Sequence, residues 1–378
     1  MNIVKSTDAY EEDLRAELGA EVVEEGLREK HAEMANAPFP FLRATYWRWA
    51  ETVREFAPEL MDAPSVLAVG DIHLENFGTW RDAEGRLIWG VNDHDEAATM
   101  PYALDLLRLV TSALLAGRPD AAAVAKPVLA GYRRGLDNPR PFVLDRDLGW
   151  LRKAVIVPER ERKSFWDKLD RKRLRFDERP DTERPQLWPR YREALTRALP
   201  AGAEPPLIWY RSAGLGSLGR PRWVAQAMWQ GDWVIREAKA MVPSAWSRVD
   251  RRTTREIRSL EIATGRYRAP DPQYRLADGI AIRRLSPNNR KINAESTTRT
   301  ASVDTEKRVE LDVLLDLEVL QAMGAELAAI HLGTPDSAEE IRRDLGQRKK
   351  GWLAEAAARA AKSIRTEQLE FRKDFRKR

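Results

Sequence analysis

The chain has 378 residues, no cysteine and only four histidines, and its 64 lysines and arginines are nearly balanced by 59 aspartates and glutamates. The lack of cysteine excludes disulfides, thiolate metal sites, iron–sulfur clusters and a cysteine nucleophile. No histidines are spaced as in H-E-x-x-H, so a bound metal would be a hard cation held by carboxylates and amides rather than zinc. The net charge of +5 permits an anionic ligand but does not indicate nucleic acid.

The sequence gives no sign of a leader or of a membrane segment. The first residues are acidic and polar, unlike a signal peptide, and no apolar run approaches the roughly 20 residues of a membrane span. We therefore expect a cytoplasmic protein without a membrane partner. At about 150 residues per domain, the length predicts two or three domains or lobes.

The predicted elements begin with helices, change to short strands and return to helices. A proline and phenylalanine cluster at 38–41 is expected to break the first helix. In chain order, the patterns predict helices over 8–34 and 42–60, strands over 65–69 and 86–91, and helices from Pro101 to about 116 and over 120–136.

The second half of the chain begins with a highly charged segment, 158–198. We interpret it as solvated helices and linker, with a basic, phosphate-facing surface as the alternative. Residues 206–240 then change to β character and contain a hairpin turn. The remaining predictions are a helix over 252–264, a strand over 279–285, a loop over 293–308, a helix over 309–332 and a charged helical C-terminus.

Two of the predicted strands end in carboxylates. The first delivers Asp71 and Asn76, and the second delivers Asp93 and Asp95. The spacing between them suits a hairpin-like return, so the two sets are expected to converge. Such oxygen ligands suit Mg²⁺, and one further carboxylate can orient a hydroxyl or take its proton. The alternative is structural, with Asp71 capping a turn and Asn76 bonding backbone.

The segment Gly70–Asn76 resembles the G-D-x-H-x-x-N catalytic loop of aminoglycoside phosphotransferases and related small-molecule kinases. Residues 91–97 and 102–106 resemble the metal-binding aspartate segment and the following helix of the same family. The resemblance implies that Asp71 is the catalytic aspartate and that Asn76 and Asp93 bind Mg²⁺. It also implies that Asp105 supports the catalytic loop. We expect His73 to bond backbone near this loop and His94 to be structural.

A closer resemblance is to a bacterial group known as domain of unknown function 2252. Its members carry P-F-x-F-L-R, G-D-x-H-x-x-N-F-G and N-D-x-D-E. These motifs occur here at 38–43, 70–78 and 92–96, and the resemblance extends from about 30 to 335.

A glycine-rich segment forms the second group of candidate residues. Gly214, Gly216 and Gly219, together with Ser217, fit G-x-G-x-x-G. Because a strand rather than a helix is predicted to follow, the pattern favours a kinase-type glycine hairpin over a dinucleotide fold. Glycine there lets backbone N–H groups approach phosphate oxygens closely. A flexible turn is the alternative.

The strand after this hairpin supplies a phosphate-binding cation, either Arg236 or Lys239. Alternation along a strand puts the two on opposite faces, so only one is expected to face a nucleotide. Glu256 or Glu261 is a possible partner for that cation. The basic residues between 283 and 291 form a further cluster that could contact a phosphorylated ligand, with a solvated loop as the alternative.

Kinase-like chains run from glycine loop to basic strand to catalytic loop, whereas here the catalytic loop comes first. The simplest hypothesis is an α+β, two-lobed, protein-kinase-like fold that is circularly permuted, with a helix-rich larger lobe and a small antiparallel-sheet lobe. Residues 1–200 would begin the larger lobe, 201–300 would form the sheet lobe, and 301–378 would complete the larger lobe.

The function that follows is an ATP- and Mg²⁺-dependent phosphotransferase acting on the hydroxyl of a small molecule or metabolite. One alternative is AMP transfer, as in kinase-like enzymes of the selenoprotein O type. Another is a pseudokinase that binds nucleotide without catalysis. The expected partners are a nucleotide and a small-molecule acceptor. Nucleic acid is not expected, and the oligomeric state stays open.

Overall fold

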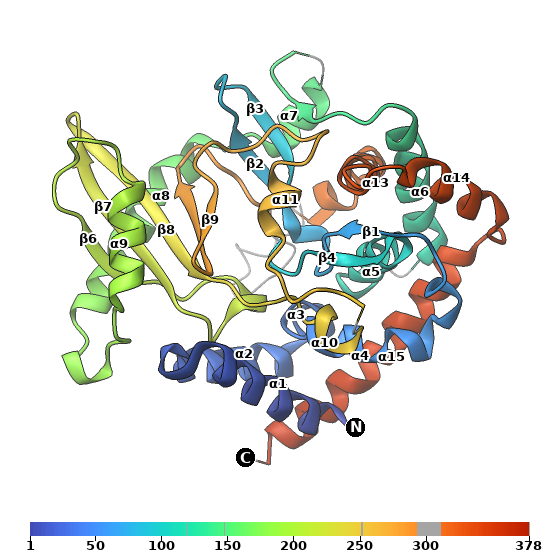
Figure 1. Cartoon of the computed structure of the whole chain (residues 1–378), viewed down its shortest axis with the longest axis horizontal. Helices are drawn as coiled ribbons and strands as arrows, with labels where there is room; N and C mark the ends of the chain where they lie inside the picture. Colours follow the sequence, from blue (N-terminus) through green and yellow to red (C-terminus); the bar gives the residue numbers. More distant parts are fainter. Residues whose placement is uncertain (119, 147, 251, 293–310, 378) are drawn as a thin grey trace.

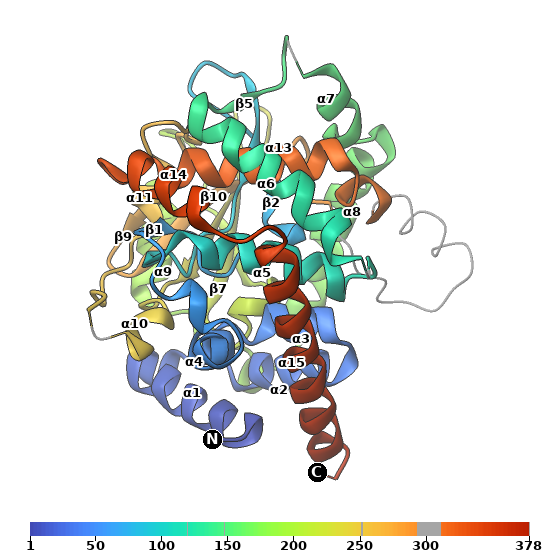
Figure 2. The same cartoon turned by 90° about the vertical axis from the view of Figure 1, so that its right-hand side faces the viewer.

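The computed structural model describes residues 1–118, 120–146, 148–250, 252–292 and 311–377. Helices contain 54% of the residues and strands contain 14%, and the sheets are small and antiparallel. The predicted α+β class is therefore confirmed. A sheet containing β6, β7 and β8 lies on one side and most helices lie on the other (Figure 1). Both termini lie on the same side of the molecule (Figures 1 and 2). Among the described helices, none is long and apolar enough to cross a membrane.

The N-terminal region contains four helices instead of the two predicted. The single helix over 8–34 is wrong, because Gly19 ends the first helix with a φ of 55°, a conformation that favours glycine. The predicted break at the proline and phenylalanine cluster is present, but it lies between two helices. Pro38 occupies the first turn of the later helix, where no backbone N–H is needed. The helices are α1 (Ile3–Leu18), α2 (Glu24–Asn36), α3 (Pro38–Ala44) and α4 (Tyr46–Phe56).

The helices of the main core come from both ends of the chain. Two of them, α6 and α13, pack closely through glycines, since a Cβ on Gly131 would lie 1.8 Å from the carbonyl oxygen of Gln321. The predicted helix over 309–332 is interrupted: within the described residues, 311–314 are helical, the chain turns at 315–316, and Asp316 then caps α13. The core helices are α5 (Tyr102–Leu115), α6 (Ala121–Asp137), α13 (Leu317–His331), α14 (Ser337–Gln347) and α15 (Trp352–Phe375).

Two small sheets accompany these helices. The strands predicted over 65–69 and 86–91 are confirmed, and the expected return is an antiparallel pair in which Phe77 lies opposite Val91. One sheet pairs β1 (Ser65–Ala68) with β4 (Ala98–Pro101), and the other contains β2 (Phe77–Arg81), β3 (Leu87–Val91) and β5 (Phe142–Val143).

The larger sheet lies within the segment expected to form the smaller lobe. Its antiparallel order is β6-β7-β8-β10-β9, and the predicted β character of 206–240 and 279–285 is confirmed. The predicted helix over 252–264 is wrong, because only its end is helical, as α11 (Ser259–Ala263). The strands are β6 (Leu207–Tyr210), β7 (Arg222–Trp229), β8 (Asp232–Ala240), β9 (Arg275–Ala277) and β10 (Ile280–Leu285).

The charged segment 158–198 contains two helices that cover the two faces of this sheet. Leu169 of α8 (Glu159–Asp177) packs with Trp209 and its neighbours on one face. Tyr191 and Leu195 of α9 (Pro189–Ala198) pack on the other face. The predicted helices are therefore present, but each buries an apolar side as well as presenting a charged one. Further short helices are α7 (Gly149–Val155) and α10 (Trp246–Val249). The loop predicted over 293–308 lies outside the described residues.

Candidate functional site

The segment that carries Asp71 is fixed by the buried carboxylate of Asp105. This carboxylate accepts hydrogen bonds from the N–H groups of Val69 (2.8 Å) and Gly70 (3.0 Å). His331 lies on its other side, with Nε2 at 3.1 Å. Gly70 has a φ of 79°, and a Cβ there would lie 2.5 Å from a backbone oxygen, so glycine is needed. Asp105 thus lies where a support for the loop was expected.

Asp71 is paired with a buried cation that the sequence did not reveal. Its carboxylate contacts Arg108, whose side chain is fully buried. Arg108 also donates to the carbonyl of Leu42 at 2.8 Å and lies over the rings of Tyr46 and Trp49. Burial raises the pKa of Asp71 to about 7, although Arg108 opposes that shift. A carboxyl with this pKa can take up a proton near neutral pH.

Asn76 connects the two acidic segments. Its Nδ2 donates to the backbone carbonyl of Asp71 at 2.7 Å and to that of Asp93 at 3.2 Å. Its Oδ1 is buried and has no hydrogen-bond partner within the described part of the chain. Because buried oxygens rarely lack a partner, this atom is suited to receive a cation.

The residue types around Asn76 are ones that Mg²⁺ accepts as ligands. In the described residues, no group of three histidines, aspartates or glutamates could hold a metal ion. An amide oxygen, one or two carboxylates and retained waters are the ligands that Mg²⁺ uses at phosphate sites. Asn76 and Asp93 supply the first two kinds.

Asp93 and Asp95 differ in their surroundings. Lys239 Nζ lies 2.5 Å from Asp95 and 3.5 Å from Asp93, and Lys291 lies 3.9 Å from Asp93. Burial favours the neutral form of both, but Lys239 and Lys291 hold the pKa of Asp93 well below its usual range. For Asp95, burial prevails and raises the pKa. Asp93 is therefore the firmly ionised group, and Asp95 is engaged by Lys239.

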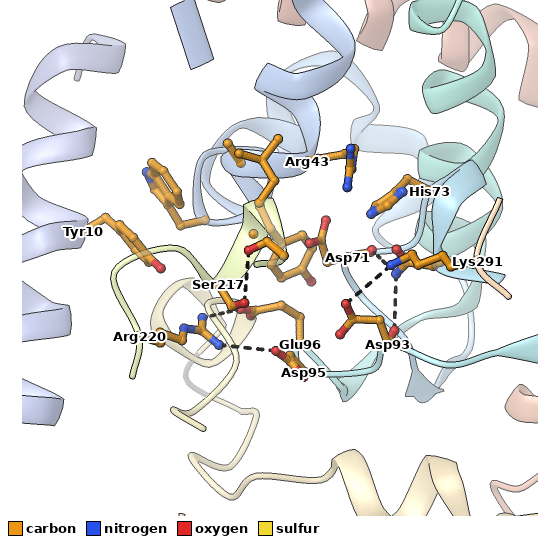
Figure 3. A pocket seen from close by; sticks show the side chains of 17 residues that line it. Tyr10, Arg43, Asp71, His73, Asp93, Asp95, Glu96, Ser217, Arg220 and Lys291 are labelled. Atoms are coloured by element: carbon orange, nitrogen blue, oxygen red, sulfur yellow. Dashed lines mark hydrogen bonds and ion pairs between the residues drawn. The ribbon is translucent and has the colours of Figure 1, made fainter. Parts of the chain in front are cut away.

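The glycine segment connects β6 to β7 and faces these acidic residues. Gly214 and Gly219 have φ values of 80° and 91°. Residues 70–76, which carry Asp71, form the acidic loop. Gly216 lies so close to this loop that a Cβ on Gly216 would be 3.2 Å from Asp71 Oδ2. In Figure 3, Asp71 lies between Ser217 and Asp93 around a shared cavity.

This shared cavity has a volume of about 40 Å³ and brings together candidate residues that are distant in the sequence. Its lining contains the predicted catalytic aspartate, all three predicted metal ligands and most of the glycine segment. The lining includes Tyr10, Arg43, Trp47, Asp71, His73, Asn76, Asp93, Asp95, Glu96, Gly214, Gly216, Ser217, Arg220 and Lys291.

Of the two candidate cations on β8, only Lys239 reaches the acidic residues. Arg236 lies on the other face of the sheet, where its Nε donates to the carbonyl of Ala198 at 3.0 Å. Glu261, a possible partner of the cation, instead pairs with Arg258 at 2.7 Å. The carboxylates beside Lys239 are those of Asp93 and Asp95.

The two histidines of this region are neutral. Burial lowers the pKa of His73 well below its usual range, and its Nδ1 accepts from the N–H of Glu75 at 3.1 Å. Burial also lowers the pKa of His94 to about 3, and its ring packs edge-on against Tyr274. His94 Nδ1 is buried without a hydrogen-bond partner in the described residues.

Two further buried residues hold the glycine segment, and the sequence reasoning missed both. Lys30 of α2 donates to the carbonyl of Gly216 at 3.0 Å and lies over the stacked rings of Tyr10 and Trp47. Arg220, next to Gly219, pairs with Glu96 at 2.9 Å. Arg220 directly follows the glycine pattern, and this position could have indicated its role. No local sequence pattern indicates the role of Lys30.

A second, larger cavity of about 280 Å³ lies next to the first, and Lys291 lines both. It runs between β10, the segment after it, and the strands β2 and β3. Its lining is rich in cations and contains the aromatic residues Trp80, Phe165 and Tyr274. The cations are Arg211, Arg268, Arg283, Arg284, Arg290 and Lys291.

Comparison with known proteins gives one match. Residues 22–138 match the model of a family described as "Uncharacterized protein conserved in bacteria (DUF2252)". No curated protein and no solved structure matches the chain. The matched residues include the acidic loop, Asp93 and Asp105, but not the glycine segment. Over this part, the chain is therefore similar to a bacterial family of unknown function, as its motifs predicted.

Proposed function

We propose that this protein is an ATP- and Mg²⁺-dependent phosphotransferase that acts on the hydroxyl of a small molecule. The observation that carries the proposal is the shared cavity. It is lined both by Asp71, Asn76 and Asp93 and by the glycine segment, with a buried Asn76 oxygen that has no hydrogen-bond partner among the described residues. This combination supplies a base, cation ligands and backbone N–H groups for phosphate within one small space.

The arrangement of elements supports a permuted, two-lobed, kinase-like fold. The glycine segment joins the first two strands of the larger sheet, and Lys239 lies on the third. The acidic loop and Asp93 come from the helical part, which is built from both ends of the chain. The termini lie on the same side, and α1 contacts α15 (Figure 2). Such termini are compatible with a moved starting point.

In this mechanism, Asp71 accepts the proton of the acceptor hydroxyl while the oxygen of that hydroxyl attacks the terminal phosphorus of ATP. A bond from that oxygen to phosphorus forms, the bond to the β–γ bridging oxygen breaks, and ADP leaves. Lys239 and the N–H groups of the glycine segment would hold the phosphates. Bound Mg²⁺, held by Asn76 and Asp93, would neutralise their charge. Most of the rate gain comes from positioning and charge neutralisation.

Labelled ATP tests this function and separates it from its alternatives. The protein is incubated with Mg²⁺, a panel of small hydroxyl compounds and ATP labelled at either the α or the γ phosphate. Phosphoryl transfer puts the γ label on the product, whereas AMP transfer puts the α label there. ATP that binds without delivering either label would instead indicate a nucleotide-binding protein without catalysis.

A further inference from the structure

We propose that the larger cavity binds a condensed phosphate chain through Arg211, Arg283 and Lys291. This deepens the proposed function and rests on it for the role of the chain as the donor's phosphates. Binding of the chain itself does not depend on turnover.

Glu237 of β8 is fully buried and is shared by three arginines. Arg222 Nη1 and Arg283 Nε each lie 2.7 Å from its Oε1, and Arg211 contacts its Oε2. Burial would raise the pKa of Glu237, but these arginines hold it well below its usual range. One ionised carboxylate contacts three guanidinium groups, and Asp93 and Asp95 attract Arg283 at longer range, so Glu237 alone does not balance the three positive charges. Such an imbalance is costly away from water unless an anion compensates it.

The contacts to Glu237 leave most donors of Arg211 and Arg283 unused. Arg283 is anchored through Nε alone and Arg211 through one terminal nitrogen, with no other hydrogen bond from either side chain to the described residues. The two side chains are 34% and 23% exposed, so a ligand can reach them. The side chain of Lys291, 35% exposed, makes one long contact of 3.9 Å with Asp93 in the part of the chain that the structure describes. Guanidinium groups fixed in this way are suited to phosphate oxygens.

The position of this cluster connects it to the shared cavity. Arg222 donates to Ser217 Oγ at 2.6 Å, which ties the cluster to the glycine segment. Lys291 lines both cavities, so a phosphate chain on Arg211 and Arg283 would lead past Lys291 to Asp93. His94, which also lines the larger cavity, has a buried Nδ1 without a partner in the described residues, an independent sign of a missing polar ligand.

Recognition through phosphates has a direct consequence. Tripolyphosphate, which has no nucleoside, should bind to this cavity, and adenosine, which has no phosphate, should bind far more weakly. ATP and GTP should bind alike, because their phosphate chains are the same.

The test is calorimetric titration of the full-length protein with sodium tripolyphosphate, ATP and adenosine in the absence of Mg²⁺. Each lost guanidinium–phosphate contact is worth a factor of about 10 or more. Arg283→Gln and Arg211→Gln should therefore each weaken tripolyphosphate binding at least about tenfold. The matched control is Arg359→Gln, which makes the same charge change on α15, where Arg359 pairs with Glu59. It should leave binding unchanged.

The proposal is overturned if tripolyphosphate does not bind, if both cavity variants bind it like the wild type, or if adenosine binds as tightly as ATP. Should Arg211→Gln fail to fold, Arg283→Gln carries the test alone. Asp93→Asn separates the two proposals, because it should abolish label transfer yet keep Mg²⁺-free binding of tripolyphosphate. Variant-sensitive binding without any label transfer would retain the phosphate site and reject the phosphotransferase.

Discussion

The acidic half and the sheet half of the candidate site are held together in different ways. In the acidic half, Asp105 fixes the backbone at Val69 and Gly70, within the main core. In the sheet half, the buried Glu237 of β8 fixes side chains from two other strands, β7 and β10, and from the loop after β6. The backbone of the loop in the acidic half thus depends on neutral N–H donors that meet one carboxylate, whereas its Asp71 side chain pairs with Arg108. The sheet half depends on one buried carboxylate that faces three arginines. Loss of one of these charges should therefore lower the free energy of unfolding more than loss of the Asp105 charge.

The largest expected effect concerns the chemistry of the acidic half. Asp71→Asn and Asp93→Asn should each lower transfer of the γ label at least about 100-fold, because one removes the base and the other a cation ligand. Thermal unfolding provides the control for folding. Wild-type transfer in either folded variant would refute its assigned role.

Glu237→Gln tests the sheet half. It leaves three arginines without their carboxylate, so the free energy of unfolding should fall by about 3–5 kcal/mol. Asp105→Asn keeps one acceptor oxygen for the loop and should cost less, about 1–3 kcal/mol. Urea denaturation of both variants measures the difference. A greater loss for Asp105→Asn would reverse the comparison.

The contact between α2 and the glycine segment provides a third test. A Cβ on Gly26 would lie 2.6 Å from the backbone nitrogen of Gly219, so Gly26→Ala should displace the segment and cost about 1–3 kcal/mol. It should also weaken ATP binding. Gly346→Ala is the control, because Gly346 lies within α14 with open space around its Cβ position. That variant should be neutral or stabilised by up to about 1 kcal/mol. Equal stability of the two variants would argue against the contact.

The smallest expected effect is a change in pH dependence. Asp71 must be ionised to act as a base, and burial raises its pKa to about 7, so kcat/KM should fall as the pH drops below about 7. Arg108 opposes this shift. Arg108→Met should therefore move the acidic limb of the profile to higher pH. A limb that stays in place, or one near pH 4 in the wild type, would show that Asp71 is not the titrating base.

The sequence predicted the convergence of Asp71, Asn76, Asp93 and Asp95 better than the contacts of the sheet half. Asp71, Asn76 and Asp93 follow short strands, and their spacing is local, so a pattern can reveal them. Arg108 reaches Asp71 across 37 residues and Lys30 reaches Gly216 across 186, and no local pattern marks such contacts. On β8, alternation correctly separated Arg236 from Lys239, but only the packing of α9 against one face decides which of them meets the acidic residues.

The helix predictions failed where a local break outweighed hydrophobic periodicity. Gly19 ends α1, although apolar residues continue at helical spacing beyond it. The charge pattern of 158–198 predicts solvated helices, because the segment has few apolar residues. Those few, such as Leu169 and Leu195, nevertheless pack against the sheet, and this depends on a partner surface that a single segment cannot reveal.

The central claim is that both halves form one site for Mg²⁺ and ATP. Calorimetric titration of the full-length protein with ATP in the presence of Mg²⁺ tests it most directly, using wild type, Asp93→Asn and Lys239→Met. We predict that the wild type binds and that each variant binds at least about tenfold more weakly. Failure of the wild type to bind, or wild-type affinity in a folded variant of either half, would contradict the claim.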